Sequence, residues 1–95
     1  MGDWTFFSNH AHVLFVISKY DQITAREIAA KVEITERFVH KILKELSEGG
    51  YIKVHKEGRN NSYHLVPEKQ LRHKIESHIQ LEKLIEFINS GEPAS

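Results

Sequence analysis

The segment ITAREIAAKVEITERFVHKILKELSEGG, residues 23–50, constrains the fold more than any other part of the chain. Within it, Thr24 is followed three residues later by Glu27, which is the spacing of a capping box at the start of a helix. Thr35 can cap a second helix, and the Gly-Gly pair at the end of the segment stops it. The segment therefore predicts two helices joined by a turn of about three residues, which is the spacing of a helix-turn-helix.

The second of these helices has two chemically different faces. Its apolar residues repeat at helical spacing in a single stripe, which predicts that one side is buried. This stripe consists of Phe38, Val39, Ile42, Leu43 and Leu46. The opposite side carries Glu36, Arg37, His40, Lys41 and Lys44. Long donors on an exposed helix face suit the major groove of DNA, where guanine presents paired acceptors; the alternative is a merely solvated face.

Residues 51–66, YIKVHKEGRNNSYHLV, contain two alternating apolar runs around the polar stretch KEGRNN. This pattern predicts a β-hairpin whose loop carries Lys56 and Arg59. An arginine at such a tip fits a narrow minor groove or a phosphate. A helix, a helix-turn-helix and then a hairpin is the order of a winged helix-turn-helix, in which the hairpin is the wing. We therefore expect a mainly α fold with a small β-hairpin, in the α+β class.

The 95 residues suffice for one domain, residues 1–95. The expected elements are a first helix within residues 4–20, the helix-turn-helix over 24–48, the wing over 51–66 and a C-terminal helix over 68–89. The apolar residues of the C-terminal helix form two displaced stripes, one of Leu71, Ile75 and Ile79 and the other of Leu81, Leu84, Ile85 and Ile88. Two stripes predict either a bend near Ser77 or two partners, namely the domain itself and a second subunit.

Charge is distributed unevenly along the chain. The total is neutral, with 13 Lys and Arg against 13 Asp and Glu. Residues 37–59, however, carry six Lys and Arg against three Asp and Glu. A local basic patch steers a protein toward phosphate whatever its total charge, so this distribution favours a nucleic-acid partner.

Several functional classes find no support in the composition. There is no cysteine, which excludes disulfides and thiolate metal sites. The longest apolar run, residues 13–17, is too short to span a bilayer, so we expect a cytoplasmic protein without membrane contact. The chain has neither a Gly-rich phosphate loop nor a nucleophile elbow, so we expect no enzyme. Seven histidines raise the question of metal binding, and His78 and Glu82 are four residues apart, but without a tight cluster we expect no metal and no cofactor.

The segment ITAREIAAKVEITERFVHKILKELSEGGYI, followed by EGRNNSYHL, resembles the small MarR-like winged-helix transcriptional regulators of bacteria and archaea. The flanking segments WTFFSNHAHVL and QLRHKIESH are similar to short single-domain members with a Trp-x-Phe-x-x-Asn-His opening and a Leu-Arg-His segment. The resemblance implies a homodimer that binds duplex DNA, with the second motif helix in the major groove and the wing on the backbone or minor groove. The effector, if one exists, is unknown.

The sequence departs from that family's pattern at three positions. Glu33 stands where such turns usually have glycine, and a left-handed conformation there would cost about 1 kcal/mol. Phe38 occupies a position that is usually small, so it either fills the core or protrudes toward the groove. Lys74 stands where relatives often have proline, which leaves the start of the last helix open.

Candidate DNA contacts come from the second motif helix and the wing. They are Thr35, Glu36, Arg37, His40, Lys41, Lys44, Lys53, Lys56, Arg59 and Asn60. Arg37 and His40 are assigned to base reading, and the lysines and Arg59 to phosphates. Glu36 accepts from cytosine or simply favours the helix N-terminus, and for Asn60 the preferred role is turn formation.

Candidate dimer contacts come from the two ends of the chain. They are Trp4, Phe7, Leu71, Ile75, Leu81, Leu84, Ile85 and Ile88. Aromatic residues at a domain terminus usually cover the core or a dimer seam. The sequence also allows two other functions: a winged helix used for protein–protein contact, and a metal- or ligand-gated sensor.

Overall fold

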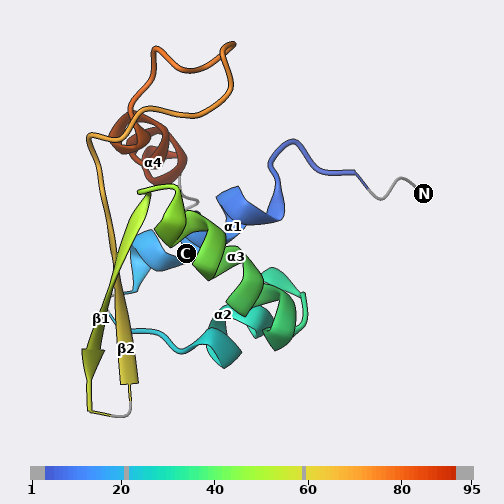
Figure 1. The fold of residues 1–95 in the computed structure, drawn as a ribbon. Coiled ribbons are helices and arrows are strands. Elements are labelled where there is room, and N and C mark those ends of the chain that lie inside the picture. The colour runs from blue at the N-terminus through green and yellow to red at the C-terminus, as the bar shows by residue number, and fades with distance from the viewer. Residues whose placement is uncertain (1–3, 21, 59, 92–95) are drawn as a thin grey trace.

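The computed structural model describes residues 4–20, 22–58 and 60–91 (Figure 1). The helices are α1 (Asn9–Lys19), α2 (Ala25–Val32), α3 (Glu36–Glu48) and α4 (Leu81–Ser90), and the strands are β1 (Ile52–Glu57) and β2 (Asn60–Leu65). The two strands pair antiparallel. This is a winged helix-turn-helix with an additional C-terminal helix, so the predicted α+β fold class is confirmed. In the described part of the chain, no helix is long and apolar enough to cross a membrane.

Side-chain caps explain where α2 and α3 begin. The hydroxyl oxygen of Thr24 accepts from the backbone N–H of Glu27 at 3.1 Å, and the backbone N–H of Thr24 donates to the Glu27 carboxylate at 2.9 Å. This is the predicted capping box. The backbone hydrogen bond from Thr24 holds the pKa of the Glu27 carboxyl below its usual range. Thr35 caps α3 by accepting from the backbone N–H of Phe38 at 3.0 Å.

The turn between α2 and α3 contains a strained residue. Glu33 has φ 66° and ψ 45°, which is the left-handed helical conformation. It is the one non-glycine residue with positive φ among those described. Its backbone N–H still bonds to Ala29 O at 2.8 Å, so the chain reverses tightly at the end of α2. The expectation that Glu33 takes a conformation suited to glycine is confirmed.

The first helix is shorter than the range 4–20. It begins at Asn9, because the side-chain oxygen of Ser8 accepts from the backbone N–H of Ala11 at 3.2 Å and caps it. Residues 4–7 precede the helix as an irregular segment.

One core holds the three central helices, the base of the hairpin and the start of α4 together. Its buried residues are Val13, Leu14, Ile17, Ile23, Ala25, Ile28, Ala29, Val39, Ile42, Leu43, Leu46, Tyr51, Ile52, Tyr63 and Leu81. In Figure 1, the hairpin lies along one side of the helices, and α4 lies at the end of the hairpin that is remote from its tip. The hairpin tip and α4 are therefore at opposite ends of the molecule.

The C-terminal helix covers only half of its predicted range. Residues 68–80 are not helical: Gln70 and Gln80 form an isolated antiparallel bridge, and the N–H of Leu71 bonds to Ile79 O at 2.9 Å. These bonds close residues 71–79 into a loop. Tyr51 fixes the base of the loop, since its hydroxyl donates to Gln70 O at 2.6 Å.

The composition of the loop explains why it is not a helix. Its central residues, 72–78, read RHKIESH and contain Ile75 as their one apolar side chain, which is 73% exposed. A short helix without an apolar face to bury is unstable in water. The predicted helical stripe of Leu71, Ile75 and Ile79 is therefore wrong. His78 and Glu82 do not share a helix face either, because α4 begins at Leu81.

Candidate nucleic-acid interface

Helix α3 separates its apolar and charged faces as its sequence predicts. Val39, Ile42, Leu43 and Leu46 are buried in the core. The side chains of the predicted polar face are all exposed: Glu36, Arg37, His40, Lys41 and Lys44. The donors of α3 are thus free of the interior and available to a partner in solvent.

The hairpin and α3 share a surface. A hollow of about 330 Å³ lies between them, lined by His40, Lys44 and Glu48 of α3 and by Val54 and Asn61 of the hairpin, among others. Lys56 pairs with Asn61 across the hairpin. Because paired residues of adjacent strands point to the same face, Lys56 lies on the face of the hairpin that adjoins α3. Cations from both elements therefore face one side of the molecule.

The remaining wing candidates are placed differently. Lys53 pairs with His64 and, because side chains alternate along a strand, it points away from the hollow beside α3. His55 lies on that same opposite face, with its ring centroid 4.9 Å from that of His64. Arg59 and the side chain of Asn60 lie outside the described residues.

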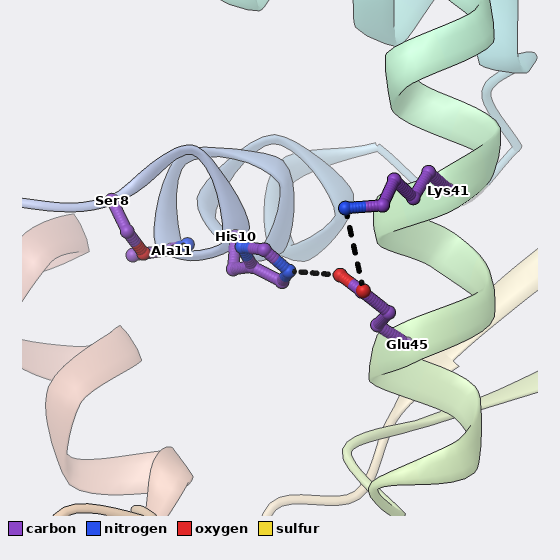
Figure 2. A network of polar contacts seen from close by, with 5 residues as sticks. All are labelled: Ser8, His10, Ala11, Lys41 and Glu45. Carbon is purple, nitrogen blue, oxygen red and sulfur yellow. Dashed lines mark hydrogen bonds and ion pairs between the residues drawn. The ribbon is translucent and has the colours of Figure 1, made fainter.

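A polar network ties α3 to α1 (Figure 2). Nε2 of His10 lies 2.7 Å from Oε1 of Glu45, and Nζ of Lys41 lies 3.6 Å from Oε2 of the same carboxylate. The hydrogen bond from His10, with a smaller contribution from Lys41, holds the pKa of the Glu45 carboxyl below its usual range. Lys41 is therefore paired on the side of α3 that faces α1. No local pattern in the sequence predicts this partner for His10, because the two residues are 35 positions apart.

The other donors of α3 differ in whether they have an ion-pair partner. His40 lies 3.6 Å from the Glu36 carboxylate, one turn away, with both side chains more than half exposed. Exposed pairs of this kind contribute little to stability, so a phosphate or base can replace the partner. Within the described residues, Arg37 and Lys44 form no ion pair.

Two residues considered for the DNA-facing surface have structural roles. The hydroxyl oxygen of Thr35 is used as the helix cap. Phe38 packs half-buried against the core, which decides between the two roles the sequence left open for it.

The predicted dimer residues fall into distinct environments. Trp4 and Ile75 are 72% and 73% exposed, whereas Phe7, Leu84 and Ile88 are half-buried. Leu71 and Ile85 pack against the core. Leu81 is completely buried in its own domain, so its assignment to a dimer contact is wrong: a side chain with no exposed surface cannot touch a second subunit.

Two further aromatic residues beside the predicted dimer contacts are exposed. Phe6 is 88% exposed and stacks edge-on against Trp4, with ring centroids 5.1 Å apart. Phe87 of α4 is 73% exposed. Its position three residues after Leu84 places both on neighbouring parts of the helix surface, and this spacing was the signal for it in the sequence.

The described residues contain no group of three or more His, Asp or Glu side chains arranged to hold a metal ion.

Comparison with known proteins identifies the same architecture. Residues 9–53 match the model of a family described as winged helix-turn-helix DNA-binding. The structure is similar to that of T. potens IscR, with a TM-score of 0.67 and 11% sequence identity, over 98% of this chain and 94% of that chain. It is also similar to the solution NMR structure of protein BT2368 from Bacteroides thetaiotaomicron, with a TM-score of 0.55 and 16% identity, over 68% of this chain and 84% of that chain. No curated protein is a significant match. At such identities the structural likeness shows the fold alone.

Proposed function

We propose that this protein is a cytoplasmic transcriptional regulator of the MarR-like type that binds duplex DNA sequence-specifically as a homodimer. The observation that carries the proposal is the shared surface of α3 and the hairpin, where His40 and Lys44 face the same side of the molecule as Lys56. The match of residues 9–53 to a winged helix-turn-helix DNA-binding family supports it. The kinship to MarR-like regulators depends on the flanking segments WTFFSNHAHVL and QLRHKIESH.

In the proposed complex, α3 lies in the major groove with its N-terminal half toward the bases. Arg37 and His40 are exposed there, and an arginine can bond both acceptors of a guanine. Lys44 and Lys56 flank them and neutralise phosphates, which fixes the position of the protein without reading sequence. A dimer would set two α3 helices about 34 Å apart, in successive major grooves of a near-palindromic site.

The test separates base reading from phosphate binding. After in-vitro selection of bound duplexes, the affinities of Arg37→Ala and Lys44→Ala are measured by fluorescence anisotropy on the selected site and on single-base variants. Arg37→Ala should lose about 1–3 kcal/mol of discrimination at one position of each half-site. Lys44→Ala should weaken all duplexes about equally. Lys74→Ala, a change of the same type in the exposed 71–79 loop, serves as the control and should bind as the unchanged protein does.

Two outcomes would contradict the proposal. Failure of the folded protein to bind any duplex at low salt would favour a protein–protein interaction module. Equal effects of Arg37→Ala and Lys44→Ala on the choice of sequence would remove the assigned division between base and phosphate contacts.

A further inference from the structure

Two histidines lie side by side on the face of the hairpin that points away from α3. His55 of β1 is opposite Ser62, and His64 of β2 is opposite Lys53, so the two imidazoles are diagonal neighbours across the strands. Both histidines are exposed, and their ring centroids are 4.9 Å apart. Side chains on one face of an antiparallel pair can reach each other across such a diagonal. Only the register of the strands brings these rings together, so no local spacing in the sequence predicts their contact.

The separation of the rings matches that of two imidazoles bound to one metal ion. In such a complex each ligand nitrogen lies about 2.0–2.1 Å from a zinc ion and roughly 1.15 Å from the centre of its own ring. Angles of about 90–110° between the two nitrogens at the ion therefore place the ring centres about 4.5–5.2 Å apart. The observed 4.9 Å falls within this range, so a shared ion requires no change of strand register. Because χ2 of histidine is a broad torsion, each exposed ring can turn one nitrogen toward the point between them.

Ser62 indicates where one of the candidate ligand atoms points. Its hydroxyl oxygen lies 3.4 Å from Nε2 of His64. Ser62 is directly opposite His55 on the same face of the hairpin. Nε2 of His64 is therefore turned along its strand toward the position of His55, which is the side on which a shared ion would lie.

The donor set indicates the class of ion. Neutral imidazole suits zinc, copper, iron and nickel, whereas calcium and magnesium prefer oxygen ligands. Among the described residues, no third imidazole or carboxylate joins the pair, so water completes the coordination of an ion at this exposed position. Lys53 is the nearest cation on this face of the hairpin, directly opposite His64. It is exposed on a long flexible stem, so its ammonium group can turn away from an ion.

We infer that His55 and His64 bind one divalent transition-metal ion, of which Zn²⁺ is the example to test, and that the ion ties β1 to β2 near the tip of the wing. The site lies on the opposite face of the hairpin from Lys56, so it is separate from the proposed DNA surface. The inference does not rest on the proposed function. An ion that binds only the folded hairpin also stabilises the protein by mass action.

Titration calorimetry of the full chain with ZnCl₂ provides the test, at about pH 7.5, where free histidine is mostly neutral. His55→Ala and His64→Ala should each weaken zinc binding at least about tenfold, since loss of a group that only orients a metal ligand already costs roughly 10–100-fold. His64→Phe keeps an aromatic ring beside His55 and should lose zinc binding equally, which separates metal ligation from ring stacking. Both histidines are exposed, so these variants leave the core intact.

The matched control is His78→Ala. His78 is also exposed, and it is the histidine that the sequence spacing relates to Glu82. This variant should bind zinc as the unchanged protein does.

Two further measurements identify the ligands and the effect on stability. In ¹⁵N–¹H correlation spectra of the imidazole nitrogens, zinc should shift the signals of His55 and His64 and leave those of His78 in place. The midpoint of thermal unfolding should rise with zinc in the unchanged protein and in His78→Ala, but not in His64→Phe.

Three results would overturn the inference: no saturable binding at millimolar zinc, unchanged zinc affinity in His55→Ala and His64→Phe, or loss of zinc binding in His78→Ala. Zinc binding at the hairpin by a chain that binds no duplex would instead contradict only the proposed function.

Discussion

At the scale of single residues, the turn of the helix-turn-helix contains the clearest conflict between sequence and backbone. Glu33 takes a left-handed conformation that costs a residue with a Cβ about 1–2 kcal/mol relative to the right-handed one. The conflict persists because the flanking helices are fixed by their caps and by the core, which leave the turn no other path.

Replacing this residue with glycine should stabilise the protein. Glu33→Gly removes the steric strain but adds flexibility to the unfolded chain, so we expect a net gain of about 0.5–1 kcal/mol in the free energy of unfolding. Ala30→Gly, at an exposed position of α2 with ordinary helical backbone, should instead lose about 1 kcal/mol. Urea denaturation of both variants measures the two effects, and destabilisation by Glu33→Gly would show that the turn is not strained.

At the scale of elements, side chains outside the core also set how α3 lies. The bond between His10 and Glu45 joins the start of α1 to the C-terminal half of α3, the helix proposed to enter DNA (Figure 2). At the other end of the chain, Leu81 alone among the residues of α4 is fully buried, and it anchors that helix. The contact between His10 and Glu45 therefore helps to position α3 against α1.

The link between α1 and α3 should make stability depend on pH in the acid range. The folded-state pKa of Glu45 lies below its usual value of 4.5, so its stabilising contribution is fully present above that value and is lost as pH falls through the folded-state pKa. Between pH 6 and pH 3, the free energy of unfolding measured by urea denaturation should decline less for Glu45→Gln than for the unchanged protein. Glu48→Gln, three residues further along α3, is the control, and its free energy of unfolding should decline more steeply than that of Glu45→Gln. Identical pH profiles for the two variants would argue against the link.

At the scale of the whole molecule, the structure places cations and exposed aromatic residues on two separate surfaces. Cations of α3 and of one face of the hairpin lie on one surface, and exposed aromatic groups lie around α4 and residues 4–7. A neutral chain can in this way present a basic surface on one side. Total charge is then a poor guide to the partner.

Salt dependence of DNA binding should reveal this division. Lys56 faces the α3 side of the hairpin and Lys53 faces away, although the sequence assigns both to phosphate. Lys56→Ala should lower the slope of log affinity against log salt by about 1 per subunit. Lys53→Ala should lower it less. A larger change for Lys53→Ala would mean that the opposite face of the hairpin approaches the DNA.

Local rules made much of the fold predictable. The capping box at Thr24, the cap at Thr35 and the apolar stripe of α3 each depend on residues a few positions apart, and the structure has all three. The alternation in residues 51–66 likewise predicted the hairpin. The predicted C-terminal helix is longer than the one in the structure. Helical spacing indicates which residues could share a face, but it does not show whether the rest of the protein offers a surface for that face to cover.

The sequence by itself determined the winged helix-turn-helix order and the separation of apolar from charged residues along α3, because short-range hydrogen bonds and periodicity specify both. Only the tertiary structure decided that Leu81 is core, that His10 bonds to Glu45, and that Phe6 and Phe87 line one hollow. These facts join residues far apart in the chain. Such contacts depend on how helices and loops pack, and no local spacing encodes them.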